Sequence, residues 1–412
     1  MNLSIVFLTL SLIGLSASLV SYFRLRLPGP IMVLEFFTGW LVGELALQVL
    51  AFQALATILF VEAGVLESTS GRVGLAATIV SWLLLIATHR RSMNAGREFR
   101  DALAEAGITP DHSVSTFHGF WKPFGFRHPD VRVERNIPYG EALPRDKGGR
   151  NLLDVYLPNE AAPGERRPVL LQVHGGAWMI GDKREQGIPL MTHLASRGWV
   201  CVAINYRLSP LATMPDHIID VKRSIAWIRA HIAEYGGNPD FVCITGGSAG
   251  GHLTTLAALT ANDPNFQPGF EEVDTHLDAA VPFYGVFDFL DRANDRGKNK
   301  MARTLAPKVF KCLPEENPEL WDSVSPITRI HSDAPPFLII QGSHDSLVYE
   351  GEADTFVQRL REKSQQPVLH ARLRGAQHAF EIFHSVRSAH AVRGATAFLE
   401  KAHADYRSAR AS

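Results

Sequence analysis

The stretch that decides the fold is Phe241-Val242-Cys243-Ile244-Thr245-Gly246-Gly247-Ser248-Ala249-Gly250-Gly251-His252. It opens with an apolar run that is typical of a buried β-strand. A helix rich in leucine and alanine is expected after it, from Leu253 to Thr260. Between the two lies the pattern Gly-x-Ser-x-Gly, which on a strand–turn–helix predicts a nucleophile elbow. Small neighbours allow the strained turn that exposes the serine, so Ser248 is the candidate nucleophile.

The segments around this stretch alternate between strand and helix. This alternation predicts an α/β fold with a mostly parallel sheet and helices on both faces. An antiparallel hairpin is expected first, with strands at 131–138 and 151–157 and a turn at 146–149. The sequence indicates further strands at 169–173, 199–205, 279–284, 337–341 and 368–373, and helices at 188–197, 215–235 and 388–403. Ligands in such sheets bind at the carboxyl ends of the strands.

A serine hydroxyl needs a base to activate it, and the base needs an orienting acid. After an elbow of this kind the acid comes next along the chain, and the base follows it. Asp345, directly after the strand at 337–341, is the preferred acid, and Asp288 is the runner-up. His378, in the loop after the last strand, is the predicted base. Two histidines that precede any suitable acid are excluded as the base: His174 and His252.

A second glycine motif provides candidate donors for the oxyanion. His174-Gly175-Gly176-Ala177-Trp178 follows the strand at 169–173, at the same edge of the sheet as Ser248. Successive glycines allow backbone N–H groups to turn toward a ligand oxygen. We therefore expect the oxyanion hole to consist of the N–H groups of Gly175, Gly176 and Ala249.

These motifs together resemble the hormone-sensitive-lipase-like branch of the α/β-hydrolases, which includes many bacterial carboxylesterases. The resemblance covers about 131–403 and includes Tyr206-Arg207-Leu208-Ser209-Pro210, Ser325-Pro326-Ile327, Gly342-Ser343-His344-Asp345 and Gly375-Ala376-Gln377-His378. It implies an α/β-hydrolase catalytic domain at 130–412 that cleaves esters through an acyl-enzyme. Ala177 departs from the third glycine that many members have. Membrane-bound isoprenylcysteine methylesterases share this style of motif.

Aromatic residues near the expected site are candidates for the substrate pocket: Trp178, Tyr284 and Phe287. The stretch 288–335 has the pattern of broken helices and is a candidate lid. Core packing explains the aromatic residues equally well, so both interpretations stay open at this point.

The first 92 residues are strongly apolar and predict a membrane anchor with about three transmembrane helices, at 3–23, 36–60 and 73–88. The residues that follow the first and third of these are basic: Arg24, Arg26, His89, Arg90 and Arg91. Basic residues accumulate on the cytoplasmic side of membranes. Three spans place both clusters on one side, so we expect a multi-pass protein with a cytoplasmic catalytic domain.

Glu44 lies inside the second apolar run, where a carboxylate is unusual. We expect it to make a helix–helix or interfacial contact rather than to act as a functional intramembrane carboxylate, because no partner charge is visible nearby. Residues 93–129 form the predicted linker. Its aromatic residues, among them Phe117, Phe120 and Trp121, are interpreted as packing on the catalytic domain, with a flap as the alternative.

Composition narrows the function further. A net charge of −1 gives no overall field that would recruit nucleic acid. Cys201 and Cys243 lie in apolar strands and are expected to be core residues, and no cysteine–histidine spacing indicates a metal site. We expect no cofactor, a lipophilic small-molecule ester as substrate and membrane lipid as surroundings. The alternatives are an amide substrate such as an arylformamide, a prenylcysteine methyl ester, a non-catalytic binding protein and a transporter.

Overall fold

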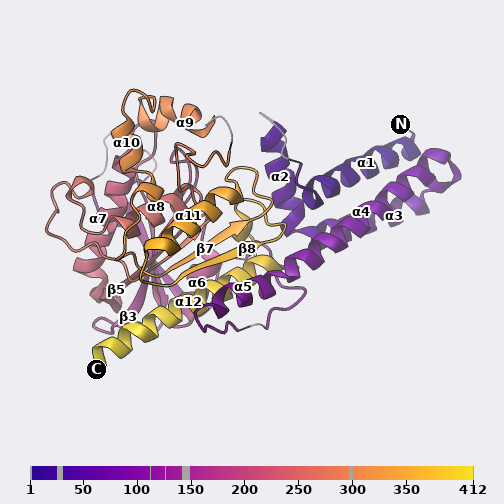
Figure 1. Ribbon diagram of the computed structural model, residues 1–412. Coiled ribbons are helices and arrows are strands. Elements are labelled where there is room, and N and C mark those ends of the chain that lie inside the picture. Colours follow the sequence, from indigo (N-terminus) through magenta and orange to yellow (C-terminus); the bar gives the residue numbers. More distant parts are fainter. Residues whose placement is uncertain are drawn as a thin grey trace.

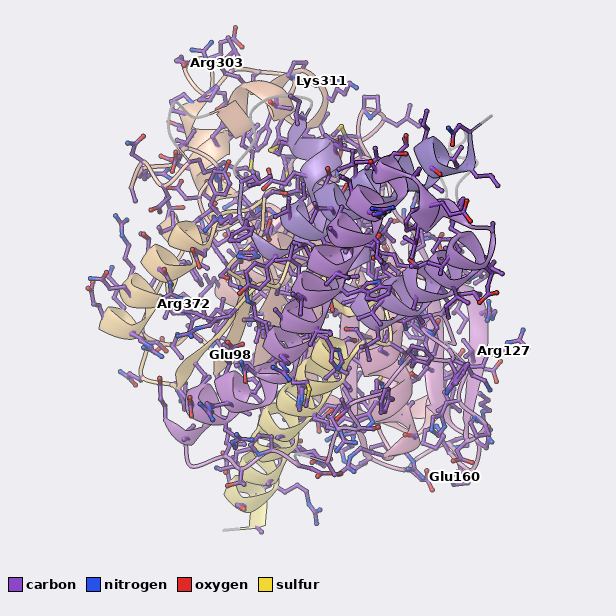
Figure 2. The ribbon with its side chains drawn as sticks, turned by 90° about the vertical axis from the view of Figure 1, so that its right-hand side faces the viewer. Glu98, Arg127, Glu160, Arg303, Lys311 and Arg372 are labelled. Carbon is purple, nitrogen blue, oxygen red and sulfur yellow. The ribbon has the colours of Figure 1, made fainter. Side chains whose placement is uncertain are left out.

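The computed structural model describes residues 2–25, 31–111, 113–125, 127–141, 149–296 and 300–411. Arg26 and the predicted turn up to residue 148 lie outside these ranges. The chain forms a helical arm at its N-terminus and a sheet-based catalytic domain behind it (Figure 1). Figure 2 views the molecule from the arm side, with Glu98 and Arg372 near the place where the arm ends and the catalytic domain begins.

The predicted sheet is present and has eight strands within the described residues, in the order β1-β2-β4-β3-β5-β6-β7-β8. The strands are β1 (Val131–Pro138), β2 (Leu152–Pro158), β3 (Arg167–Val173), β4 (Val200–Asn205), β5 (Gly237–Gly247), β6 (Ala279–Phe283), β7 (Phe337–Gly342) and β8 (Val368–Leu373). The hairpin of β1 and β2 is antiparallel, and β2 pairs antiparallel with β4. The pairs from β4 to β8 are parallel, so their carboxyl ends share one edge.

Helices cover both faces of the sheet. One face carries α5 (Ala95–Ala104), α6 (Ile188–Ser196) and α12 (Val386–Ala411), and the other carries α7 (Asp216–His231), α8 (Ala249–Leu259) and α11 (Glu350–Lys363). α5 comes from the stretch predicted as a linker. It packs against α12 and β8, with Phe99 buried beside Gly394. The catalytic core therefore includes residues N-terminal to the predicted domain start.

The arm consists of α1 (Leu3–Tyr22), α3 (Ala46–Glu62) and α4 (Thr69–Met93). Among the described residues, two helices are long and apolar enough to cross a membrane, Leu3–Tyr22 and Thr69–Ala104, the latter running through α4 and α5. The predicted second span at 36–60 is wrong as one straight helix. It is divided into α2 (Ile31–Glu44) and α3, which are bent by 85° relative to each other. α2 and α3 together form a third span only if they cross the membrane as one bent helix.

Inside the arm, polar side chains face one another and large apolar side chains face outward. Thr78 donates to the Ser11 hydroxyl at 2.9 Å, and the Ser18 and Ser81 hydroxyls lie 2.7 Å apart. Outside, Phe52 is 72% exposed and Leu83 is 63% exposed. Water would disfavour this arrangement, whereas in lipid it shields polar side chains by pairing them between neighbouring helices. The packing is typical of a membrane helix bundle.

Ion pairs attach the base of the arm to the catalytic domain. Arg24 contacts Glu350 at 2.6 Å. Glu44, at the end of α2, pairs with Arg387 of α12, and both side chains are buried. The interfacial interpretation of Glu44 agrees with this contact, but the expectation that it has no partner charge is wrong. Arg387 lies 343 positions further along the chain, so only the fold brings the two together.

Candidate active site

Ser248 lies between the end of β5 and the start of α8, with φ 59° and ψ −120°. A non-glycine residue with such angles is strained, and the surroundings must hold it there. The nearby glycines permit this turn. A Cβ on Gly246 would lie 2.5 Å from the carbonyl oxygen of Val173, and a Cβ on Gly250 would lie 2.1 Å from the same oxygen. The Gly-x-Ser-x-Gly pattern therefore reflects close contact between β3 and the elbow.

Replacing Gly250 by alanine is expected to destabilise the protein by about 3 kcal/mol or more, because the new methyl group overlaps the backbone of Val173 and cannot be relieved by a side-chain rotation. Thermal unfolding in detergent measures the effect. Gly269→Ala is the matched control: nothing lies within 4 Å of its Cβ position, and only its left-handed φ of +80° opposes alanine. An equal loss in both variants would contradict the steric explanation.

The predicted acid and base lie together at the next strand ends. The Oδ2 atom of Asp345 is 2.7 Å from Nδ1 of His378, and both side chains are buried. The other oxygen, Oδ1, accepts the backbone N–H groups of Leu347 and Val348, each at 2.8 Å. These bonds fix the carboxylate, so it can hold the imidazole in one orientation and stabilise its cation.

Tyr284 connects this pair to the nucleophile. Its ring lies 4.4 Å from the ring of His378, and its hydroxyl lies 2.6 Å from where a Cβ on Gly247 would be. The N–H of Ser248 in turn donates to the carbonyl of Phe283 at 3.0 Å. Tyr284 thus packs against both the elbow at Gly247 and the ring of His378. Its own side chain is only 1% exposed.

The glycine loop lies directly against Ser248: a Cβ on Gly175 would be 3.0 Å from the serine Cβ. One predicted donor needs correction. The N–H of Gly175 already donates to Oε1 of Gln186 at 2.7 Å, so this group is engaged in holding the loop. Gly176 and Ala177 follow with left-handed φ angles of 116° and 51°. The N–H of Ala249, the first residue of α8, has no partner within its helix.

The rejected alternatives have other roles in the structure. Asp288 pairs with Arg292 and accepts the backbone N–H groups of Leu290 and Arg292, so it organises its own loop. His252 bonds through Nε2 to the carbonyl of Val324 at 2.7 Å, which agrees with the local packing role expected for it. Burial lowers the pKa of His174 to about 4, so its ring is neutral.

All three pocket candidates are buried: Tyr284 as described above, and Trp178 and Phe287 as core residues. Trp178 packs on His252 and Phe289 with 2% of its surface exposed. Phe287 is fully buried and stacks on Phe356 with ring centroids 4.3 Å apart. Both aromatic side chains support the site from the sheet side, and neither has free surface for a substrate. In the sequence, their apolar character fitted a substrate pocket and core packing equally well.

The candidate lid at 288–335 contains α9 (Lys300–Leu305) and α10 (Pro318–Ser323). Its side chains Phe310 and Trp321 pack on Phe289, on the side of the core that holds His252. The segment that lies against His378 is α2, whose Phe36 ring is 6.2 Å from the imidazole. The sequence pattern of α2 indicated only membrane insertion, so its position over the site was not predicted.

Glu381 is a further titratable group near the site that the sequence analysis did not single out. It lies three residues after His378 and is buried, and the burial raises its pKa to about 7. The Tyr284 hydroxyl and His378 act in the opposite direction and lower the pKa of this carboxyl. The signal available in the sequence was only its spacing from His378.

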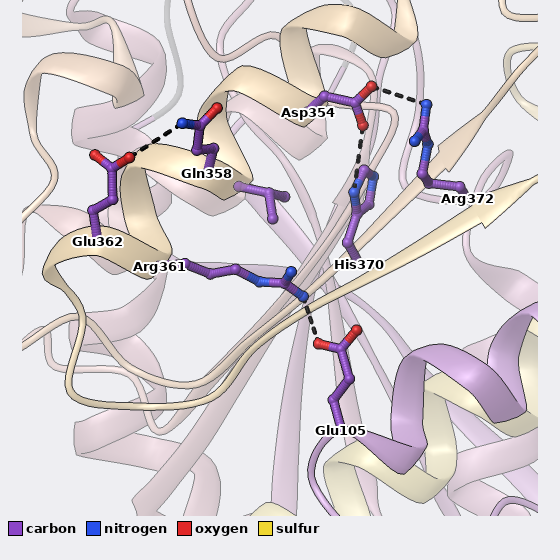
Figure 3. Close-up of a pocket in the computed structure, with 8 residues that line it drawn as sticks. Glu105, Asp354, Gln358, Arg361, Glu362, His370 and Arg372 are labelled. Carbon is purple, nitrogen blue, oxygen red and sulfur yellow. Dashed lines mark hydrogen bonds and ion pairs between the residues drawn. The ribbon is translucent and has the colours of Figure 1, made fainter.

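A surface groove of about 710 Å³ lies between α11, β8 and the end of α5 (Figure 3). Its charged groups bind one another rather than pointing into free space: Arg361 contacts Glu105 at 2.6 Å, and Asp354 contacts Arg372 at 2.9 Å. It is an ion-pair network joining α5 to the catalytic domain. Among the described residues no group of His, Cys, Asp or Glu side chains has the geometry of a metal site.

Comparisons with known proteins agree with this geometry. The BD-FAE family model matches residues 153–360. A Mycobacterium tuberculosis protein named probable carboxylic ester hydrolase LipM is 42% identical over 417 residues, covering 96% of this chain and 93% of that protein. This alignment includes most of the N-terminal arm. Esterase LipQ from the same organism is 48% identical over 254 residues, which is 61% of this chain and 58% of LipQ.

Solved structures share the fold. A truncated carbohydrate esterase from gut microbiota aligns with a TM-score of 0.52 at 24% identity, covering 66% of this chain and 96% of that one. An esterase from Thermogutta terrifontis with butyrate bound gives a TM-score of 0.51 at 24% identity, covering 61% and 86%. Taken with the sheet order and the elbow at Ser248, the family match and the LipM alignment show that this chain belongs to the BD-FAE family of α/β-hydrolases.

Proposed function

We propose that this chain is a membrane-anchored serine hydrolase that cleaves carboxylic esters through an acyl-enzyme on Ser248. The observation that carries the proposal is the 2.7 Å contact between buried Asp345 and His378, beside an elbow serine and a glycine loop. Relatives named carboxylic ester hydrolase and esterase, at 42% and 48% identity, support the same chemistry.

In the first step, Nε2 of His378 takes the hydroxyl proton of Ser248 while the serine Oγ bonds to the ester carbonyl carbon. The carbonyl oxygen becomes an oxyanion, which the N–H groups of Gly176, Ala177 and Ala249 stabilise. The bond to the alcohol then breaks, and His378 gives its proton to the leaving oxygen. Water repeats the same sequence on the acyl-enzyme and releases the acid, with Asp345 stabilising the imidazolium each time.

A fluorophosphonate probe tests this assignment directly, because it bonds covalently to an activated serine oxygen. We expect the wild-type protein to be labelled at Ser248 and Ser248→Ala to remain unlabelled. The Ser325→Ala variant is the matched control: that serine is also buried, but its hydroxyl bonds to the carbonyl of Trp321. Labelling at another serine, or none in the folded wild type, would overturn the assignment.

The other functions weighed from the sequence are less well supported. An amide substrate needs the same groups, but the relatives are named esterases. A non-catalytic binding protein has no need for a complete acid–base–nucleophile set. A transporter would use the intramembrane carboxylate of Glu44, and that side chain is paired with Arg387. Ester hydrolysis is therefore the function that the site supports best.

A methyl ester of a prenylated cysteine is the second candidate substrate. An isoprenylcysteine α-carbonyl methylesterase of Arabidopsis thaliana is 27% identical over 244 residues, which is 56% of this chain. Such a substrate places its lipid on the acyl side of the scissile bond and releases methanol. Hydrolysis of a prenylcysteine methyl ester at a higher kcat/KM than that of long-chain alkyl acetates would favour this candidate.

The arm supports a membrane location and an orientation. Arg24 and the basic end of α4, with Arg90 and Arg91, lie at the base of the arm next to the catalytic domain. Since basic residues favour the cytoplasmic side, we propose that the catalytic domain is cytoplasmic and that α1, α3 and α4 enter the bilayer.

A reporter that is active on only one side of the membrane, fused after Ser412, is expected to give a cytoplasmic signal. Fusion of the same reporter in the loop between α3 and α4, after Gly64, is the control and is expected to give the opposite signal. An extracytoplasmic signal from the C-terminal fusion would contradict the orientation. Equal signals from both fusions would contradict the membrane crossing of α3 and α4.

A further inference from the structure

α2 is the part of the N-terminal region that lies against the catalytic histidine loop. The ring of Phe36 meets the His378 ring edge-on, with centroids 6.2 Å apart and planes at 71°. One turn further along, Nε1 of Trp40 donates to the carbonyl of Ala379 at 2.8 Å, and its ring packs on Phe383 at 4.6 Å. Two aromatic side chains from the anchor thus border the site that hydrolyses the ester.

A close approach of the backbone holds the helix there. Gly39 lies between the two aromatic residues, and a Cβ on it would be 3.3 Å from Nε2 of Gln377, the residue before His378. α2 and α3 are bent by 85° relative to each other. α2 packs on α1 and α4 of the arm, and its Phe36 and Trp40 reach the histidine loop from there.

A buried polar contact fixes the end of α2. Glu44 pairs with Arg387, both side chains are about 1% exposed, and the hydroxyl of Ser385 donates to the same carboxylate at 2.6 Å. A buried ion pair of this kind costs desolvation and mainly specifies one arrangement over others. Here the arrangement that it specifies is the docking of α2 beside His378.

Other side chains of α2 are apolar and exposed. Leu34 is 67% exposed, and Phe37 is 49% exposed while its ring also packs on Phe36 with centroids 4.9 Å apart. α2 therefore presents apolar side chains both to the site and to the surroundings of the arm.

The chemistry of the first step indicates which part of the ester meets α2. His378 must give its proton to the leaving alcohol oxygen, so the alcohol moiety lies on the histidine side of the site during acylation. Phe36 and Trp40 flank the histidine loop on that side. Apolar side chains here favour an alcohol with a long hydrocarbon chain.

We propose that Phe36 and Trp40 of α2 determine specificity for esters of lipophilic alcohols, and that the Glu44–Arg387 pair positions α2 for this role. The proposal rests on the proposed ester hydrolysis at Ser248. It assigns to the membrane region a part of the substrate site, so the anchor contributes to selectivity as well as to location.

Two substrate series on the full-length protein in detergent test the proposal. One series keeps acetate as the acid and lengthens the alcohol from methyl to dodecyl; the other keeps methanol as the alcohol and lengthens the acid. For Phe36→Ala and for Trp40→Ala, we expect kcat/KM on dodecyl acetate to fall about tenfold or more, as is usual for lost apolar pocket contacts. We expect methyl acetate to change by less than about threefold.

Leu34→Ala is the control, since it removes a large apolar side chain from an exposed position of the same helix; both series should remain unchanged. An equal loss on methyl and dodecyl acetate, or a loss confined to the acyl series, would overturn the assignment of α2 to the alcohol side. Failure of the proposed function is a separate outcome: the wild type would then show no Ser248-dependent hydrolysis of any ester.

The positioning role has its own test. Glu44→Gln keeps both aromatic residues in the sequence but removes the ion pair that positions α2. We therefore expect the ratio of kcat/KM on dodecyl acetate to kcat/KM on methyl acetate to fall about tenfold. Thermal unfolding shows whether the variant is folded, and Glu44→Asp, which keeps the charge, is expected to recover part of the ratio. A folded Glu44→Gln protein with an unchanged ratio would overturn the positioning role.

Discussion

Replacing Ser248 by alanine is expected to lower kcat for p-nitrophenyl acetate by about four to six orders of magnitude, the range typical for loss of a serine nucleophile. The oxygen that forms the acyl-enzyme is removed, and water has no comparable position. The backbone is unaffected: the N–H of residue 248 still donates to the carbonyl of Phe283, and alanine tolerates φ 59° about as well as serine does.

Stopped assays with purified protein in detergent measure this change, and the thermal unfolding temperature should stay within a few degrees of wild type. Residual activity above the hydrolysis catalysed by the solvent should come from the oxyanion donors alone. Retained turnover with an unchanged fold would show that another group attacks the ester, and the nucleophile would have to be reassigned.

Asp345→Asn is expected to lower kcat by about 10⁴-fold, which is typical when a histidine is held in the wrong tautomer. The environment decides which way the amide turns. The site of Oδ1 accepts two backbone N–H groups, from Leu347 and Val348, so it retains the amide oxygen. The amide nitrogen then faces Nδ1 of His378 and donates to it. The histidine proton is displaced to Nε2, where it blocks proton transfer from Ser248.

The pH dependence separates this explanation from a loss of folding. In the variant the imidazole can no longer act as a base in its stable tautomer, so kcat should remain low across the whole pH range in which the protein is folded. Asp288→Asn is the matched control: a buried aspartate at the next strand end that bonds to its own loop and to Arg292. It is expected to lose stability and to keep its turnover per folded molecule. Equal losses of kcat in both variants would contradict a special role for Asp345.

The strand pattern was largely predictable because a buried parallel strand leaves a local trace. Val368–Leu373 and the hairpin of β1 and β2 appear where the apolar runs and the turn residues indicated them. α11 was not predicted. It is a mostly polar helix, with only a narrow buried stripe that includes Phe356 and Leu360. Its stability comes from packing on β7 and β8, which the local sequence does not reveal.

Within the site, too, some features follow from the local sequence and others only from the packed fold. Gly246, Ser248 and Gly250 are within five positions of one another, so their spacing in the sequence already indicated the turn. The engagement of Gly175 with Gln186 is different, because the side chain belongs to a separate loop and reaches the glycine only after β3 and α6 are in place. Trp178 and Phe287 likewise have the composition of pocket residues, and their burial was decided by which face of the core each one meets.

For this protein the sequence alone determined the order of the sheet strands, the elbow and the chain order of candidate nucleophile, acid and base, since these depend on short-range patterns and on chain order. The tertiary structure decided what touches the site. The buried pair of Glu44 with Arg387 and the contact of Phe36 with His378 each join residues more than three hundred positions apart, and the 85° bend between α2 and α3 accompanies both contacts. The sequence shows that α2 is apolar. Because the hydrophobic effect is non-directional, it does not specify which surface an apolar helix packs on, so only the folded chain shows that α2 lies beside His378.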